Sequence, residues 1–157
     1  MLKTQISLLG IILLVAFIET VLVPEVWGTL RCDLFLGMII GVIIHLGFSQ
    51  GLLFVMVTSV LLQAFTGARP GLLPLFYLFT FVVLNIIKDI IYLENIMTQL
   101  MLAAAFSALG AGALVLFLDI SLTSRELAAV TLGTVLTGCA SPLMAALVGR
   151  VKRAYEG

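Results

Sequence analysis

The sequence predicts an all-α integral membrane protein, a compact bundle of six transmembrane helices. Hydrophobic residues make up 62% of the chain and charged residues only 10%. The apolar residues fall into successive runs separated by short polar breaks, and a helix needs about 20 residues to cross a hydrocarbon core of about 30 Å. The whole chain, 1–157, is therefore predicted to form a single transmembrane domain. The predicted helices cover about 4–23, 33–48, 51–66, 71–87, 95–118 and 124–148.

The first apolar segment ends at Pro24, because proline cannot continue a helical hydrogen-bond ladder and restricts the residue before it. The same segment also fits a secretory signal, with Lys3 as the basic region and 6–18 as the apolar core. Glu19, however, stands where a signal peptide needs small residues for cleavage. We therefore interpret the segment as a retained helix.

The second and third segments are each short, but together they are too long for one crossing. Gly47, Ser49, Gln50 and Gly51 lie between them and predict a break that forms a tight helical hairpin.

The fourth segment follows the turn signal Pro70-Gly71, and Pro74 lies in its first turn, where a missing N–H has little effect. The fifth segment begins after Glu94 and is closed by Asp119.

The sixth segment begins after a polar stretch in which Thr123 or Ser124 can cap a helix. Glu126 suits the positive end of the helix dipole. Pro142, inside this segment, predicts a kink.

Charge is balanced, with eight Lys and Arg residues against eight Asp and Glu residues, so nothing indicates a nucleic-acid partner. Cys32 and Cys139 have no metal-binding or disulfide spacing and are interpreted as small packing residues. We expect no metal and no cofactor.

The cations predict the orientation, since Lys and Arg in short loops are retained on the cytoplasmic side. Six crossings place both termini on one side. That side would carry Lys3, Lys88, Arg150, Lys152 and Arg153, and the other side Arg31, Arg69 and Arg125. Both termini are therefore predicted to be cytoplasmic.

Intramembrane transporters and enzymes place ionisable groups deep in the bilayer, where they are costly. Here such groups map to helix ends or loops, where we expect them at the interface. They are Glu19, Asp33, Lys88, Asp89, Glu94, Asp119, Arg125 and Glu126. His45 has no partner at helical spacing, and the chain contains no hydrolase, metalloprotease or phosphate-loop motif. We therefore expect a protein that is not an enzyme.

Small residues at helical spacing are the remaining feature. Gly37 and Gly41 form a Gly-x-x-x-Gly motif inside an apolar segment, where missing side chains let another backbone approach closely. Ala108 with Gly112 and Gly138 with Pro142 repeat the spacing. The motif fits either packing within the chain or a partner-binding face. In the second case Gly37 and Gly41 would receive an apolar helix, with Arg31 and Asp33 at the outer rim, and Gly37→Leu or Gly41→Leu would weaken a partner complex.

Three stretches together resemble the rod shape-determining protein MreD family. They are Asp33-Leu34 opening an apolar helix, His45-Leu46-Gly47-Phe48-Ser49-Gln50-Gly51, and Leu61-Leu62-Gln63-Ala64-Phe65-Thr66-Gly67-Ala68-Arg69-Pro70-Gly71-Leu72. The ending Thr137-Gly138-Cys139-Ala140-Ser141-Pro142-Leu143-Met144 with a basic tail is similar to the last helix of that family. The chain departs from the family pattern at Cys32, where proline is frequent, and at Gln63, where an acidic residue is usual.

The resemblance implies a non-enzymatic scaffold of the bacterial inner membrane that supports cell elongation and lateral-wall peptidoglycan synthesis. It implies MreC as the direct partner, and through it MreB, RodA and a penicillin-binding transpeptidase. It also implies a six-helix fold similar to the substrate-binding subunits of energy-coupling-factor transporters.

That fold leaves a solute-binding membrane subunit as the alternative function. Such a subunit would need polar side chains that converge on the outer side. The candidates are Glu19, Trp27, Arg31, Gln63, Arg69 and Arg125.

Overall fold

A computed structural model of the chain describes residues 2–19, 32–66, 71–118 and 123–156. These residues form six helices and no strand, which confirms the predicted all-α class for this part of the chain. The helices are α1 (Leu2–Phe17), α3 (Leu34–His45), α4 (Phe48–Thr66), α5 (Leu72–Ile87), α6 (Ile96–Leu118) and α7 (Ser124–Glu156). Of the described helices, α4, α6 and α7 are long and apolar enough to cross a membrane, and α3 and α5 are shorter apolar helices.

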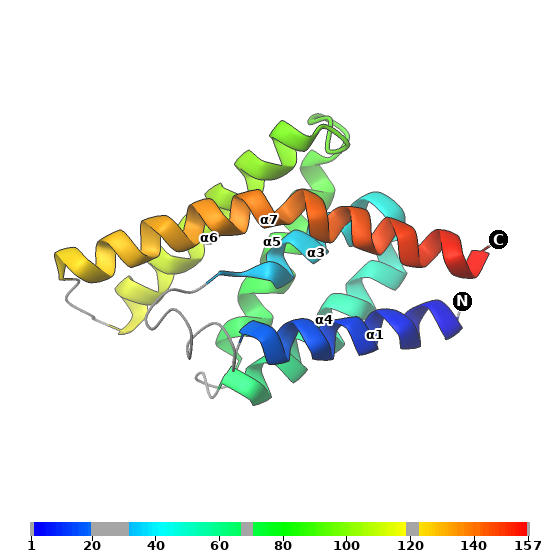
Figure 1. Ribbon diagram of the computed structural model, residues 1–157, viewed down its shortest axis with the longest axis horizontal. Helices are drawn as coiled ribbons and strands as arrows, with labels where there is room; N and C mark the ends of the chain where they lie inside the picture. The colour runs from blue at the N-terminus through cyan, green and yellow to red at the C-terminus, as the bar shows by residue number, and fades with distance from the viewer. Residues whose placement is uncertain (1, 20–31, 67–70, 119–122, 157) are drawn as a thin grey trace.

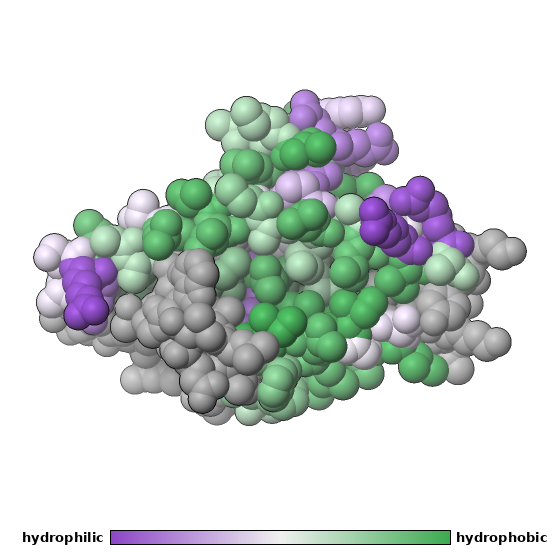
Figure 2. All heavy atoms as spheres, in the orientation of Figure 1, coloured by the Kyte–Doolittle hydropathy of each residue, from purple (hydrophilic) through white to green (hydrophobic). Residues whose placement is uncertain are grey.

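The two ends of the chain lie at the same end of the molecule, where α1 begins and α7 finishes (Figure 1). Hydrophilic side chains gather at both ends of α7 and at the connection between α5 and α6, and hydrophobic side chains cover the surface between them (Figure 2). Large apolar side chains such as Leu75, Ile86 and Leu116 are more than 60% exposed on that surface. An apolar band bounded by polar ends is compatible with a membrane protein.

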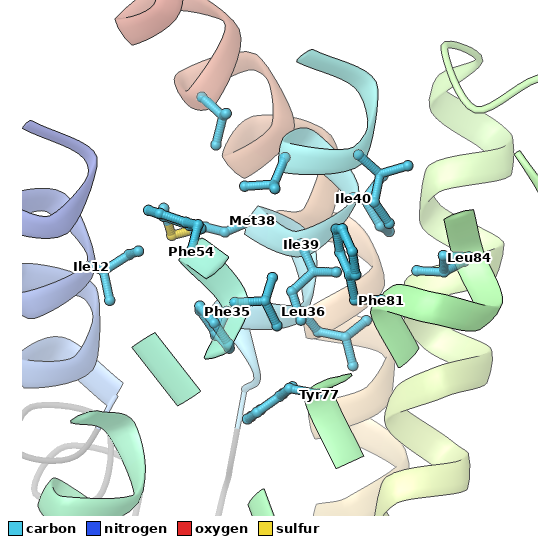
Figure 3. Close-up of a cluster of buried hydrophobic side chains, with 14 of the residues drawn as sticks. Ile12, Phe35, Leu36, Met38, Ile39, Ile40, Phe54, Tyr77, Phe81 and Leu84 are labelled. Carbon is cyan, nitrogen blue, oxygen red and sulfur yellow. The ribbon is translucent and has the colours of Figure 1, made fainter. Parts of the chain in front are cut away.

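Helix α3 lies at the centre of the fold. Nine consecutive residues of α3, from Phe35 to Ile43, are buried. Their side chains meet Ile12 of α1 and Phe54 of α4 on one side and Phe81 of α5 on the other (Figure 3). Because α3 is apolar all round, it can only be placed inside a bundle or in lipid.

The most extensive packing joins α3 to α7. The two helices run in the same direction, and every fourth residue of one meets every fourth residue of the other at a constant offset of 104 positions. The four pairs are Asp33 with Thr137, Gly37 with Ser141, Gly41 with Ala145, and His45 with Gly149. Rows of residues four apart are the ridges that interlock when two helices pack.

Helix α7 continues to Glu156, beyond the predicted end near 148. The prediction ended the helix where the charged residues begin, but Lys152 donates a hydrogen bond to the carbonyl of His45 and so ties the extra turns to α3. Pro142 lies inside α7 as expected. Proline removes one helical hydrogen bond, and the hydroxyl of Ser141 donates to the Gly138 carbonyl that this bond would have used, over 2.9 Å.

The break between the second and third segments is shorter than predicted. Helix α3 ends at His45 and α4 begins at Phe48, so Gly51 is helical. A Cβ added to Gly51 would lie 2.9 Å from the ring of Phe81 and 3.0 Å from Val42. This glycine therefore serves close packing between α3, α4 and α5, and only Leu46 and Gly47 form the break.

Helix α5 begins directly after Gly71, whose φ of +88° is in the left-handed region that favours glycine. The side-chain carbonyl of Gln63 accepts a hydrogen bond from the Gly71 N–H over 2.9 Å, which links the last turn of α4 to the start of α5. Helix α1 is α-helical to Phe17 and continues as a π-helical turn at Ile18 and Glu19, and the predicted end at 23 lies outside the described residues. So does the predicted stop at Pro24.

Candidate functional site

Polar side chains converge at the first turn of α3. Asp33 is the N-cap residue, and its Oδ1 atom accepts a hydrogen bond from the Leu36 N–H over 3.0 Å. The first N–H groups of a helix have no partner within the helix, so an acceptor at this position satisfies one of them. The motif Asp33-Leu34, which carried part of the family resemblance, is therefore a helix start.

A second carboxylate reaches the same helix end from α1. Oε1 of Glu19, two residues beyond α1, accepts hydrogen bonds from the N–H groups of Leu34 and, over 3.3 Å, of Phe35. Negative charge is favourable at a helix N-terminus because the backbone dipoles point their positive end there. Glu19 and Asp33 together thus satisfy three of the free N–H groups of α3.

Tyr77 of α5 and Thr137 of α7 complete the cluster. The Tyr77 hydroxyl donates to Oδ2 of Asp33 over 2.9 Å, and the Asp33 N–H donates to the hydroxyl oxygen of Thr137 over 2.9 Å. The Tyr77 ring packs edge-on against Phe35, with 4.8 Å between the ring centroids. Thr137 in turn donates to the Gly133 carbonyl. The cluster therefore joins α3 to α1, α5 and α7.

The cluster lies beside the middle of α7. Between Glu126 and Arg150, α7 carries no charged residue, and Thr137 lies one position from the middle of that stretch. At 1.5 Å per residue, Thr137 is about 20 Å from the start of α7. Glu19 and Asp33 lie at helix ends, as expected, and these ends lie beside the middle of α7 because α1 and α3 are much shorter than α7. The location of both carboxylates at the membrane interface stays a prediction.

The chemistry of the cluster follows from its hydrogen bonds. Each bond that the structure describes to the carboxylates of Glu19 and Asp33 comes from a neutral donor, either a backbone N–H or the Tyr77 hydroxyl. Among the described residues no three His, Cys, Asp or Glu side chains come close enough to hold a metal ion. The described geometry therefore supports a structural role, in which the cluster holds helices together.

The four residues predicted to bind a partner are only partly brought together. Arg31 lies outside the described residues. Asp33 is in the cluster, and Gly37 and Gly41 face α7 of the same chain. An added Cβ would lie 2.7 Å from the Cα of Ser141 at Gly37, and 2.7 Å from the Cα of Ala145 at Gly41. The Gly-x-x-x-Gly motif was expected to serve either packing within the chain or binding of a partner. The observed contact is packing within the chain, and a partner helix could reach Gly37 and Gly41 only by displacing α7.

Other polar residues make local bonds. Gln99 donates to the Leu93 carbonyl over 2.9 Å. Thr58, Thr131 and Thr134 donate to carbonyls one turn earlier, as threonine commonly does in helices. Both cysteines are free thiols.

Sequence reasoning missed the partner of the Gly-x-x-x-Gly motif. Small residues recur every fourth position in α7, and this signal was present in the sequence although only the Gly138 and Pro142 spacing was noticed. The row is Thr137, Ser141, Ala145 and Gly149. Tyr77 was also missed, because a tyrosine in an apolar helix gives no sign of which carboxylate it meets.

A cavity of about 550 Å³ lies at the other end of α3, between that end, the beginning of α6, and α7. His45, whose imidazole lies against Gly149, is one of its walls, and Glu94 is another. On α7 the cavity lies about two turns from Thr137 of the carboxylate cluster, in the direction of the helix C-terminus.

Comparison of the chain with protein-family models, with curated proteins and with solved structures gives no match. The resemblance to the MreD family accordingly rests on the residues quoted above.

Proposed function

We propose that this protein is an integral membrane scaffold of the bacterial cell-elongation complex, which binds MreC and supports lateral-wall peptidoglycan synthesis. The proposal is based on the hydrogen bonds of the polar cluster formed by Glu19, Asp33, Tyr77 and Thr137. Ionisable side chains within a membrane helix bundle suggest a site of function. Here Glu19 and Asp33 are half-buried, and the described bonds of the cluster go to helices of the same chain, which supports a role in holding a shape rather than in chemistry or transport.

The arrangement of helices and charges supports the proposed location in the inner membrane. The marked termini lie at one end of the molecule, as an even number of crossings requires (Figure 1). Arg150, Lys152 and Arg153 lie near that end, in the final turns of α7, and Lys88 follows α5. Since loops rich in Lys and Arg stay in the cytoplasm, both termini are proposed to be cytoplasmic. The six-helix likeness to energy-coupling-factor binding subunits is part of the same proposal.

The partner surface has to be an outward face. The contact around Gly37 and Gly41 is filled by α7, so we propose that MreC binds without entering it. Through MreC the chain would connect to MreB, RodA and the penicillin-binding transpeptidase.

The solute-binding alternative is less well supported. It needs polar side chains around a cavity on the side opposite the termini. Gln63, one of the residues expected there, accepts a hydrogen bond from Gly71, and Glu19 bonds to the start of α3. The cavity described above lies toward the termini.

Affinity purification from the native membrane in mild detergent tests the proposal, with mass spectrometry of the proteins and small molecules that co-purify. Recovery of MreC with wall-synthesis enzymes is the expected result. Recovery of an ATPase module with a bound solute would replace the scaffold by the transporter subunit. A parallel purification of an unrelated tagged six-helix membrane protein serves as the control for nonspecific capture.

A further inference from the structure

The cavity at the end of α3 has a size typical of ligand sites, at about 550 Å³. The end of α3, the start of α6 and the middle of α7 line it, it is open to the outside, and most of its walls are apolar. The lining residues are Ile44, His45, Glu94, Ile96, Gln99, Pro142, Leu143, Ala145 and Ala146. The proposed scaffold function makes no use of this cavity, and the inference below does not depend on that function.

The packing of α6 against α7 accounts for the cavity. The two helices meet closely at Gly138, where an added Cβ would lie 3.0 Å from the Leu100 carbonyl oxygen. The cavity begins beside this point, at Gln99 on α6, and extends to Ile96 on α6 and Pro142 on α7, each one turn away from the contact. Figure 1 shows α6 crossing α7 at a steep angle, so the helices separate from the contact point. A wedge of space therefore remains between them, closed at its base by α3.

One part of the cavity wall continues into the apolar outer surface. Leu143 is 69% exposed and Ile96 is 65% exposed, and both also line the cavity. In a bilayer these exposed side chains face lipid. The cavity is therefore accessible to an acyl chain from the side.

The other part of the wall carries a negative charge, and a positive charge lies beside the wall. Glu94 is exposed, and its carboxylate accepts a hydrogen bond from the Tyr92 hydroxyl over 3.2 Å. Lys152 is not part of the wall, but its ammonium donates to the carbonyl of the wall residue His45, which places a positive charge next to the cavity. A ligand that suits both groups has an anionic part and a cationic part at one end and an apolar chain at the other.

We propose that this cavity binds a zwitterionic aminophospholipid, of the phosphatidylethanolamine class, from the leaflet on the side of the termini. One acyl chain occupies the wedge between α6 and α7 and passes out beside Leu143. The phosphate lies near Lys152 and the primary ammonium near Glu94. An anionic lipid such as phosphatidylglycerol keeps the phosphate interaction but has no ammonium for Glu94. The negative charge of Glu94 therefore repels the anionic headgroup.

Native mass spectrometry of the purified full chain tests this proposal, with dioleoyl phosphatidylethanolamine and dioleoyl phosphatidylglycerol as the probes. The expected result is that the ethanolamine lipid is retained about fivefold better, which is the size of effect expected from one charge contact with the headgroup. Glu94→Gln removes the preference and leaves phosphatidylglycerol retention equal or higher. Ala146→Phe fills part of the cavity from an exposed position and lowers the retention of both lipids. Leu132→Phe is the matched control, because Leu132 is exposed on the same helix away from the cavity.

Three results would overturn the proposal. The first is equal retention of both lipids by the unaltered chain. The second is a preference that survives Glu94→Gln, which would place the headgroup elsewhere. The third is unchanged retention in Ala146→Phe relative to Leu132→Phe, which would mean that the lipids bind only to the general outer surface. Thermal unfolding of each variant in detergent confirms that it is folded before its lipid retention is compared.

Discussion

The backbone N–H of Asp33 donates a hydrogen bond to the side-chain hydroxyl of Thr137, across 104 positions of sequence. This bond begins a row of four contacts between α3 and α7 that ends where His45 meets Gly149. It also sets the level of the carboxylate cluster, beside the middle of the uncharged part of α7. The polar cluster and the glycine motif are thus two parts of one helix interface.

The Asp33 side chain is predicted to contribute strongly to stability. Asp33→Ala removes the N-cap of α3 and leaves the Tyr77 hydroxyl without its acceptor, which together should lower the free energy of unfolding by about 2 to 4 kcal/mol. Asp33→Asn keeps an acceptor for the Leu36 N–H and should lose about 1 kcal/mol. Thermal unfolding in detergent measures both. Equal losses for the two variants would show that the cap is not the source of the effect.

The glycines of α3 are predicted to be needed for packing within the chain. Gly37→Ala or Gly41→Ala would force a Cβ against the backbone of α7 and should lower the free energy of unfolding by about 1 to 3 kcal/mol. Gly112→Ala is the matched control in α6, since nothing lies within 4 Å of its added Cβ. That variant should be neutral or slightly more stable. If the α3 variants unfold like the control and instead lose MreC, the partner-binding reading of the motif is the correct one.

Thr80 provides a test of how much a buried hydroxyl without a hydrogen-bond partner lowers the stability. Its hydroxyl is buried in α5 and has no hydrogen-bond partner in the structure. Thr80→Val keeps the shape of the side chain and removes the unsatisfied group, so it should raise the free energy of unfolding by about 1 to 2 kcal/mol. Thr58→Val serves as the comparison, because the buried Thr58 hydroxyl does donate, to the Phe54 carbonyl over 2.6 Å. Thr58→Val should therefore not raise the free energy of unfolding. A rise as large as that of Thr80→Val would mean that packing, and not the unsatisfied hydroxyl, causes the effect.

The proposed resemblance to the MreD family would put an acidic residue at Gln63, and the contacts of Gln63 predict that such a charge is dispensable. The amide oxygen accepts from the Gly71 N–H, and a carboxylate oxygen can do the same. Gln63→Glu should therefore change the free energy of unfolding by less than about 0.5 kcal/mol. Gln63→Leu removes the acceptor and should cost about 1 kcal/mol. Chemical or thermal unfolding of the pair in detergent distinguishes the two outcomes.

The sequence was a good guide to the helices because their limits depend on local signals. The turn at Gly71 and the cap at Thr123, whose N–H donates to Glu126, mark the starts of α5 and α7, and both are visible as residue types. The end of α7 was misjudged, because the bond from Lys152 to His45 is between distant segments. Gly51 was taken as a helix break, whereas the nearby ring of Phe81 explains it.

The candidate site was much less predictable. Asp33 was recognised as a helix start, but its partners Tyr77 and Thr137 come from other helices. Glu19, which bonds to the next two residues of α3, comes from a third segment. Only tertiary packing brings them together. The position of the two carboxylates along α7 was likewise not visible in the sequence, since it depends on how far the short helices α1 and α3 extend along α7. A search for small residues at every fourth position in both helices would have paired α3 with α7.

The central position of α3 has a consequence for biosynthesis. At 1.5 Å per residue its twelve residues extend about 18 Å, less than the roughly 30 Å thickness of a bilayer core. Its main packing partner, α7, follows α4, α5 and α6 in the chain and is therefore synthesised after them. Contacts that bury Gly37 and Gly41 against α7 therefore form only after α7 has been translated. Until then α3 lacks its main packing partner, which makes this the stage at which a membrane chaperone would be most useful.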